Sequence, residues 1–145
     1  MATYVPDGWS REGYIEGSRP SDTGERLWES LEFTYRPATR MEVVRLDSKI
    51  DIALRSDTEE SAIRAEMLAC EFVAARIEDW SLKSAGMHPV KVSADGCARM
   101  NANLFKRLYE IVRGSSLSDA KPGSNEKSKS DEELLGNSQA ASGSV

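Results

Sequence analysis

Apolar and polar residues alternate most clearly over residues 31–37, where Leu31, Phe33 and Tyr35 are separated by polar side chains. A period of two is typical of a strand with one buried face. Pro37 ends this strand because proline has no N–H to donate to a neighbouring strand. A second short strand is predicted over residues 14–16, inside a turn-rich stretch punctuated by glycine and proline.

Helical signals begin directly after the strand at residues 31–37. Thr39 with Glu42 three residues later forms a capping box, which predicts a helix from about residue 40 to residue 55. The apolar stripe of this helix comprises Met41, Val44, Ile50 and Leu54.

A longer helix is predicted over about residues 58–78, where Asp57 or Thr58 serves as the N-cap and the interior lacks glycine and proline. Its apolar residues form two faces: Ile63, Met67, Cys70, Ala74 and Ile77 on one, and Ala62, Ala65, Ala69, Phe72 and Val73 on the other. A surface helix needs only one such stripe. This helix is therefore expected to lie centrally in the domain or to meet a second chain, which leaves a homo-oligomer open.

The second half of the chain predicts a hairpin and two further helical segments. Residues 80–82 and 90–92 are short apolar stretches that can pair across a loop. Ser93 caps a helical turn that extends to about Met100, and a last helix with a wide apolar face runs to Gly114, its C-terminal stop. The predicted fold class is α+β and mainly helical, with three to four helices and a few short antiparallel strands.

The domain organisation follows from changes in composition. Residues 1–30 are interpreted as a turn-rich N-terminal arm and residues 31–114 as the core domain. Residues 115–145 contain nine serines and no aromatic residue. Such a segment buries too little apolar surface to offset its ordering entropy, so a disordered tail is predicted.

Charge and hydropathy exclude several classes of function. The formal net charge is −5, and no run of Lys or Arg exceeds two residues. A nucleic-acid partner is therefore not expected, since such proteins usually carry a basic stripe. No apolar run is long enough to span a bilayer, and the N-terminus lacks the features of a signal peptide. A cytoplasmic location is predicted.

Residues suited to catalysis are few. The only histidine is His88, expected in an exposed turn, and the only cysteines, Cys70 and Cys97, are expected to be reduced. This set makes neither a zinc site nor a recognisable nucleophile and base pair, and no phosphate-binding glycine loop occurs. The chain is therefore predicted not to be an enzyme and to need no cofactor or metal.

Apolar and aromatic side chains remain as candidates for a functional role, which would be the binding of a partner protein, because aromatic residues dominate protein interfaces. Seven residues of the core domain are candidates for binding a partner protein: Ile63, Met67, Phe72, Trp80, Leu82, Phe105 and Tyr109.

The order of motifs over residues 31–114 resembles a known family. The strand ends in Tyr35-Arg36-Pro37, the alanine-rich helix leads into Trp80-Ser81-Leu82, and a glycine-containing turn precedes Pro89-Val90-Lys91-Val92. The core closes on a helix that begins Leu104-Phe105. This layout resembles the small tail assembly chaperones of tailed bacteriophages and of prophage regions in bacteria.

The resemblance implies a specific role. Such chaperones bind the long tape measure protein, keep it soluble in the host cytoplasm while the tail tube polymerises around it, and then leave. They have no catalytic residues, and many are made in a short and a frameshift-extended form. Two alternatives stay open: a structural virion component, such as a tail accessory or head–tail completion protein, and a small regulatory module.

Overall fold

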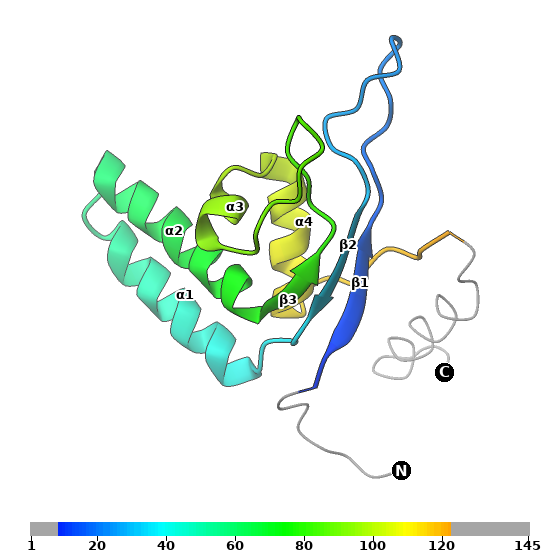
Figure 1. The fold of residues 1–145 in the computed structure, drawn as a ribbon. Coiled ribbons are helices and arrows are strands. Elements are labelled where there is room, and N and C mark those ends of the chain that lie inside the picture. The colour runs from blue at the N-terminus through cyan, green and yellow to red at the C-terminus, as the bar shows by residue number, and fades with distance from the viewer. Residues whose placement is uncertain (1–8, 123–145) are drawn as a thin grey trace, which may run out of the picture.

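A three-stranded antiparallel sheet forms one side of the molecule and a helical hairpin projects from the other (Figure 1). The computed structural model describes residues 9–122. Along this part of the chain the elements are β1 (Arg11–Ile15), β2 (Leu31–Tyr35), α1 (Arg40–Leu54), α2 (Glu59–Arg76), β3 (Ile77–Trp80), α3 (Ala94–Ala98) and α4 (Ala102–Arg113). The described residues thus confirm an α+β fold that is mainly helical.

The sheet has the order β1-β2-β3, with β2 at the centre. Leu31, Phe33 and Tyr35 are buried on one face of β2, as the alternating pattern predicts. Ile15 lies opposite Leu31 on β1, and Trp80 lies opposite Phe33 on β3. One face of all three strands therefore contributes to the same core.

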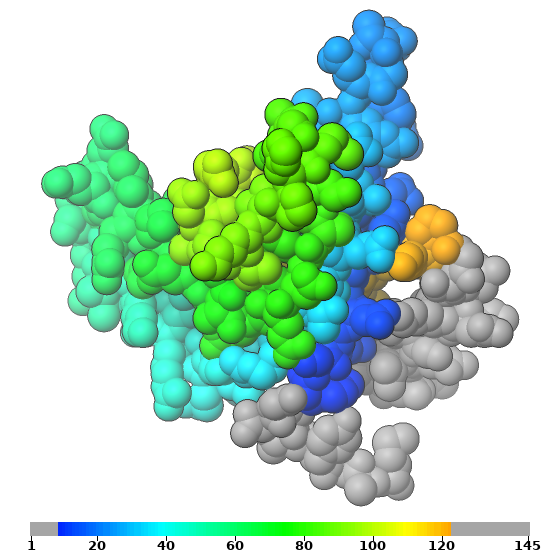
Figure 2. All heavy atoms as spheres, in the orientation of Figure 1, coloured from blue at the N-terminus to red at the C-terminus, as the bar shows by residue number. Residues whose placement is uncertain are grey.

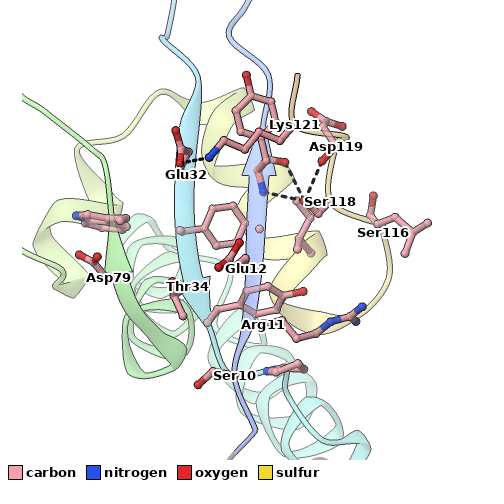
Figure 3. A pocket seen from close by; sticks show the side chains of 18 of the residues that line it. Ser10, Arg11, Glu12, Glu32, Thr34, Asp79, Ser116, Ser118, Asp119 and Lys121 are labelled. Carbon is pink, nitrogen blue, oxygen red and sulfur yellow. Dashed lines mark hydrogen bonds and ion pairs between the residues drawn. The ribbon is translucent and has the colours of Figure 1, made fainter. Parts of the chain in front are cut away.

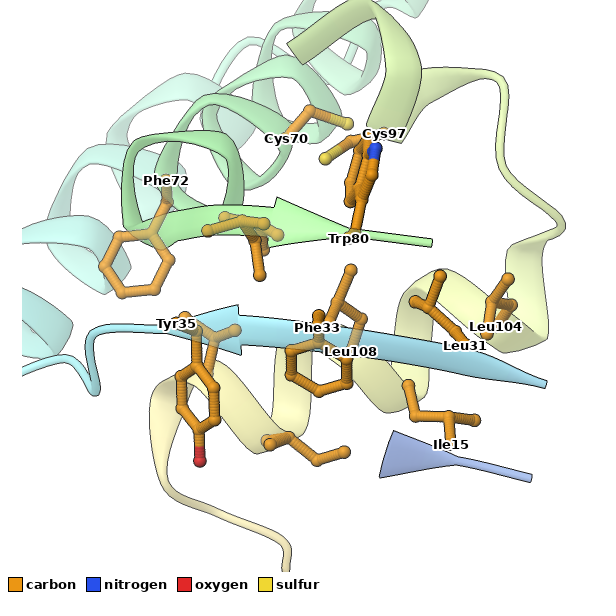
Figure 4. Close-up of a cluster of buried hydrophobic side chains, with 14 of the residues drawn as sticks. Ile15, Leu31, Phe33, Tyr35, Cys70, Phe72, Trp80, Cys97, Leu104 and Leu108 are labelled. Atoms are coloured by element: carbon orange, nitrogen blue, oxygen red, sulfur yellow. The ribbon is translucent and has the colours of Figure 1, made fainter. Parts of the chain in front are cut away.

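Helix α2 occupies the centre of the helical layer, as its two apolar faces predict. It packs against α1, α3 and α4 and also contacts β3. Figure 4 shows core side chains from α2, α3, α4 and the strands converging on one cluster. Leu108 of α4 and Val73 of α2 are fully buried in it.

The helix caps agree closely with the sequence signals. Thr39 and Glu42 form the complete capping box, Thr58 caps α2, and Ser93 caps α3. Gly114 ends α4 with a φ of 86°, a left-handed conformation that glycine adopts without steric cost. Helix α2 ends at Arg76 rather than near residue 78, because Ile77 is extended and opens β3.

The predicted division into arm, core and tail is wrong at both boundaries. Residues 11–15 are a strand of the sheet with Ile15 in the core, so the core begins before residue 31. Residues 16–30 form a long loop between β1 and β2, closed by a hydrogen bond from Ser18 N–H to the Trp28 carbonyl. This loop and the helical hairpin both project from the body of the molecule (Figure 2).

The C-terminal boundary also moves. Residues 115–121 lie against β1, where Ser118 and Asp119 hydrogen-bond to its backbone. The predicted core therefore ends too early at residue 114. The rest of the predicted tail, and residues 1–8, lie outside the described residues.

The predicted hairpin of residues 80–82 and 90–92 is present in shorter form. Val90 N–H donates to the Leu82 carbonyl, and Lys83 and Pro89 form a single bridge. Trp80 is the last residue of β3 and lies opposite Phe33 of β2, so it belongs to the sheet and not to the hairpin. Its indole N–H still reaches across to the Val90 carbonyl at 2.7 Å.

Candidate interaction surfaces

The seven residues predicted to bind a partner differ widely in exposure. Ile63 is 54% exposed, and Met67, Leu82, Phe105 and Tyr109 are half-buried. Phe72 and Trp80 are buried in the core, which contradicts their assignment as partner contacts. Their aromatic surface is already used within the chain.

Phe72 lies on the second apolar face of α2 and is covered by two neighbouring side chains. The Arg76 guanidinium lies 3.9 Å from the centre of its ring, and the ring of Tyr109 meets it edge-on at a centroid distance of 6.4 Å. Tyr109 in turn stacks on Phe105 at 5.9 Å. The structure thus brings three of the seven predicted residues together across α2 and α4.

Arg113 links this aromatic row to α1. It lies over the Tyr109 ring and donates to both carboxylate oxygens of Asp47, at 2.6 and 3.1 Å. The hydrogen bond from Arg113 lowers the pKa of Asp47, and burial raises the pKa of Tyr109. The C-terminal turn of α4 is therefore tied to α1, and the half-buried Phe105 and Tyr109 present a preorganised aromatic edge.

The outer face of α1 carries exposed apolar residues, some of which were predicted to lie in its apolar stripe. Met41, Val44 and Leu54 belong to the predicted apolar stripe, but Leu54 is 49% exposed and Met41, Val44 and Ile52 are half or more exposed. Leu46 is the buried residue of α1, while Val43 and Ile50 pack against the core. Positions 41, 44 and 52 lie on one face of a helix, which we name the α1 face.

A signal for the α1 face is present in the sequence. Apolar residues occur all round this helix rather than on one side, as its eight apolar residues from Met41 to Leu54 show. Helix α2 packs along one side of α1, and α4 reaches α1 through the ion pair of Arg113 with Asp47. A helix with one packed side buries only one apolar stripe. The apolar residues of α1 outside that stripe therefore stay in water or meet a partner.

A second surface lies at the edge of the sheet, where residues 115–121 run beside β1. We name these residues the C-terminal strap. Tyr14 N–H donates to Ser118 Oγ at 2.7 Å, and Asp119 N–H donates to the Tyr14 carbonyl at 2.9 Å. Glu16 N–H donates to Asp119 Oδ2 at 2.9 Å. Figure 3 shows the strap passing alongside β1 with Ser118 facing its backbone.

Charged side chains fasten the strap at two further points. Arg107 of α4 donates to Ser116 Oγ and Asp119 Oδ1, both at 2.7 Å, and to the Leu117 carbonyl. Lys121 Nζ reaches Glu32 of β2 at 2.7 Å, and this contact raises the pKa of Lys121. The strap and the sheet together border a cavity of about 630 Å³.

Glu42 is the centre of a charged cluster where α1 begins and α2 ends. Thr39 N–H and both Arg36 and Arg76 point at its carboxylate, with Arg76 Nη2 at 2.9 Å. Desolvation acts to raise the pKa of Glu42, but these hydrogen bonds and the Arg76 charge outweigh it and lower the pKa to about 2. The cluster borders a smaller cavity of about 340 Å³ between α1 and α2.

The groups that usually perform chemistry are poorly placed for it. Both cysteines are free and buried, and burial raises the pKa of the Cys97 thiol to about 12, which disfavours the reactive thiolate. His88 is exposed in the loop after β3. Residues 9–122 contain no group of three or more metal-ligating side chains. Within the same range, none of the helices has the length and apolarity to cross a bilayer.

Comparison of the chain with protein-family models, with curated proteins and with solved structures found no match.

Proposed function

We propose that this chain is a bacteriophage or prophage tail assembly chaperone. In this role it acts by binding rather than by catalysis, in the cytoplasm of the bacterial host. Its client is the tape measure protein or another tail protein, and the α1 face is the contact surface. The resemblance over residues 31–114 supports the class of function.

The α1 face is the observation that carries the proposal. Met41, Val44 and Ile52 project from a helix whose opposite side packs against α2. A row of apolar side chains at helical spacing is the surface that an amphipathic helix recognises. Long helical clients offer many such stripes along their length.

The size of the α1 face fits a holder that must later release its client. Burying the exposed half of each of three apolar side chains contributes roughly 1 kcal/mol each, or about 3 kcal/mol in total. A contact of that size is weaker than about millimolar. Several copies bound along one long client are therefore needed to keep it soluble, and each copy can leave singly.

The motifs that carry the resemblance lie in or against the core and do not form the proposed contact surface. Trp80 and Leu104 are buried core residues, and Leu82 and Phe105 pack against the core. They support the fold that presents α1. Substitutions that test client binding therefore belong on the α1 face, where the core is left intact.

Co-expression with the client provides the test. The proposed client, a tape measure protein from the same genome, is expected to be soluble with the native chain and to co-elute with it. In Val44→Lys/Ile52→Lys the α1 face carries two ammonium groups, so the soluble fraction of the client and the co-eluting complex are expected to be lost. Lysine favours helix formation at least as well as valine or isoleucine, so α1 is retained.

Ala98→Lys is the control for a new lysine on the surface, because position 98 is an exposed helical residue of α3 that lies outside the α1 face. It is expected to hold the client as the native chain does. Equal client solubility without this chain, or with the Val44→Lys/Ile52→Lys variant, argues against the proposal. Mass spectrometry of purified particles separates a chaperone, which is absent from the particle, from a structural virion component.

A further inference from the structure

The C-terminal strap is held to the sheet by polar contacts and buries little apolar surface. Leu117 is its only large apolar residue and is half-buried, and every other strap residue is half-buried or exposed. Ion pairs and hydrogen bonds at such exposed positions each contribute little, because water competes for the same groups. The strap can therefore leave the sheet while the core stays folded.

Release of the strap uncovers a strand edge. Tyr14 directs its N–H and its carbonyl away from β2 and toward Ser118 and Asp119. Backbone groups at an uncovered strand edge are a template for pairing with another chain. The β1 edge is thus a docking site that the chain normally fills itself.

Side chains beside this edge select what can dock. Arg107 offers two N–H groups to a carboxylate and a hydroxyl, and Glu32 offers a carboxylate to a cation. A segment that satisfies them needs a hydroxyl, a carboxylate three residues later and a lysine two residues after that. Ser116, Asp119 and Lys121 supply this order.

The connection between α4 and the strap is suited to redirecting it. Gly114 ends the helix at a φ of 86° and has open space around its Cα. Glycine also reaches extended conformations at no steric cost, so a change at this one residue points the strap away from its own sheet.

We propose that two copies of the chain exchange their C-terminal straps, each adding residues 115–121 to the β1 edge of the other. The contacts of residues 116–121 with the sheet and with Arg107 are then remade between chains, and the backbone changes at Gly114, where the hydrogen bond from Ser115 N–H to the Glu110 carbonyl is lost. Exchange of identical elements is a low-cost route to a two-fold dimer. The dimer is expected to increase with concentration.

A charge-reversed pair tests the exchange in the full-length chain. In Arg107→Glu, residue 107 repels Asp119, and in Asp119→Arg, residue 119 repels Arg107. Each mismatch acts both within one chain and between identical chains. Only in a mixed dimer with exchanged straps does each reversed residue meet an opposite charge, at both sites.

Sedimentation velocity is expected to show a species of twice the monomer mass in the mixture and monomer in each variant alone. The double variant Arg107→Glu/Asp119→Arg, which restores the pair within one chain, is expected to sediment as the native protein does. A mixture that stays monomeric while both variants keep native circular dichroism overturns the proposal. Equal dimerisation of either variant alone also overturns it, because that dimer does not depend on the strap.

Discussion

Gly13 has no side chain at the point where the Phe33 ring crosses β1. The two residues lie opposite each other in the sheet, and a Cβ on residue 13 would approach the ring to 2.3 Å. Gly13→Ala is expected to lower the free energy of unfolding by about 1–3 kcal/mol, because the buried ring has to move. Urea denaturation of the variant and the native protein measures this loss.

A double-mutant cycle identifies the ring as the cause of that loss. Gly13→Ala/Phe33→Leu removes the atoms that the new methyl group meets, so alanine at position 13 is expected to cost less in the Phe33→Leu background than in the native one. Equal costs in both backgrounds would place the strain in the backbone of β1 instead.

Local sequence signals predicted the start or end of a helix well where neighbouring residues alone determine it. The capping box of Thr39 and Glu42 fixes the start of α1, and Gly114 fixes the end of α4. A short strand was predicted over residues 14–16 and β1 overlaps it, but its place in the sheet and the strap beside it were not predicted, because the partners are remote: Tyr14 meets Ser118 over a separation of 104 residues. No short-range pattern in a glycine-rich or serine-rich segment records such a contact.

The candidate site was predictable to a similar degree. The central position of α2 follows from its two faces, but which aromatic residues remain available does not. Phe72 is covered by Arg76, one turn further along the same helix, and by Tyr109 of α4, which tertiary packing brings in. The Trp80 indole meets the Val90 carbonyl across the following loop. Met41 and Val44 stay exposed because, within residues 9–122, no further helix or strand covers the α1 face.

Glu42 joins three elements, since Arg36 follows β2, Arg76 ends α2 and Glu42 itself lies in the first turn of α1. Its pKa falls from 4.5 in the unfolded chain to about 2 in the folded one. The unfolded state therefore binds the proton more tightly. The stabilisation by Glu42 is complete above about pH 4.5 and is lost as the pH falls toward 2.

Denaturation at a series of pH values measures this effect. The carboxylate is a quarter exposed, so solvent screening reduces the expected contribution to about 1–2 kcal/mol. Glu42→Gln is expected to be less stable than the native protein at pH 7, with the difference narrowing as the pH falls. A constant difference across this range would show that the charge of Glu42 does not stabilise the fold.

The molecule as a whole depends on one core that α4 closes against the sheet. Leu108 is 0% exposed at its centre, whereas Leu27 in the projecting loop is 71% exposed. The same leucine-to-alanine change is therefore expected to cost about 2–5 kcal/mol at position 108 and at most about 0.5 kcal/mol at position 27. A domain of this size has only about 5–15 kcal/mol of stability, so Leu108→Ala uses much of it. Thermal and urea denaturation of both variants measure the contrast. Comparable losses at the two positions would mean that the projecting loop packs on the body in solution, and that the core extends beyond the cluster around α4.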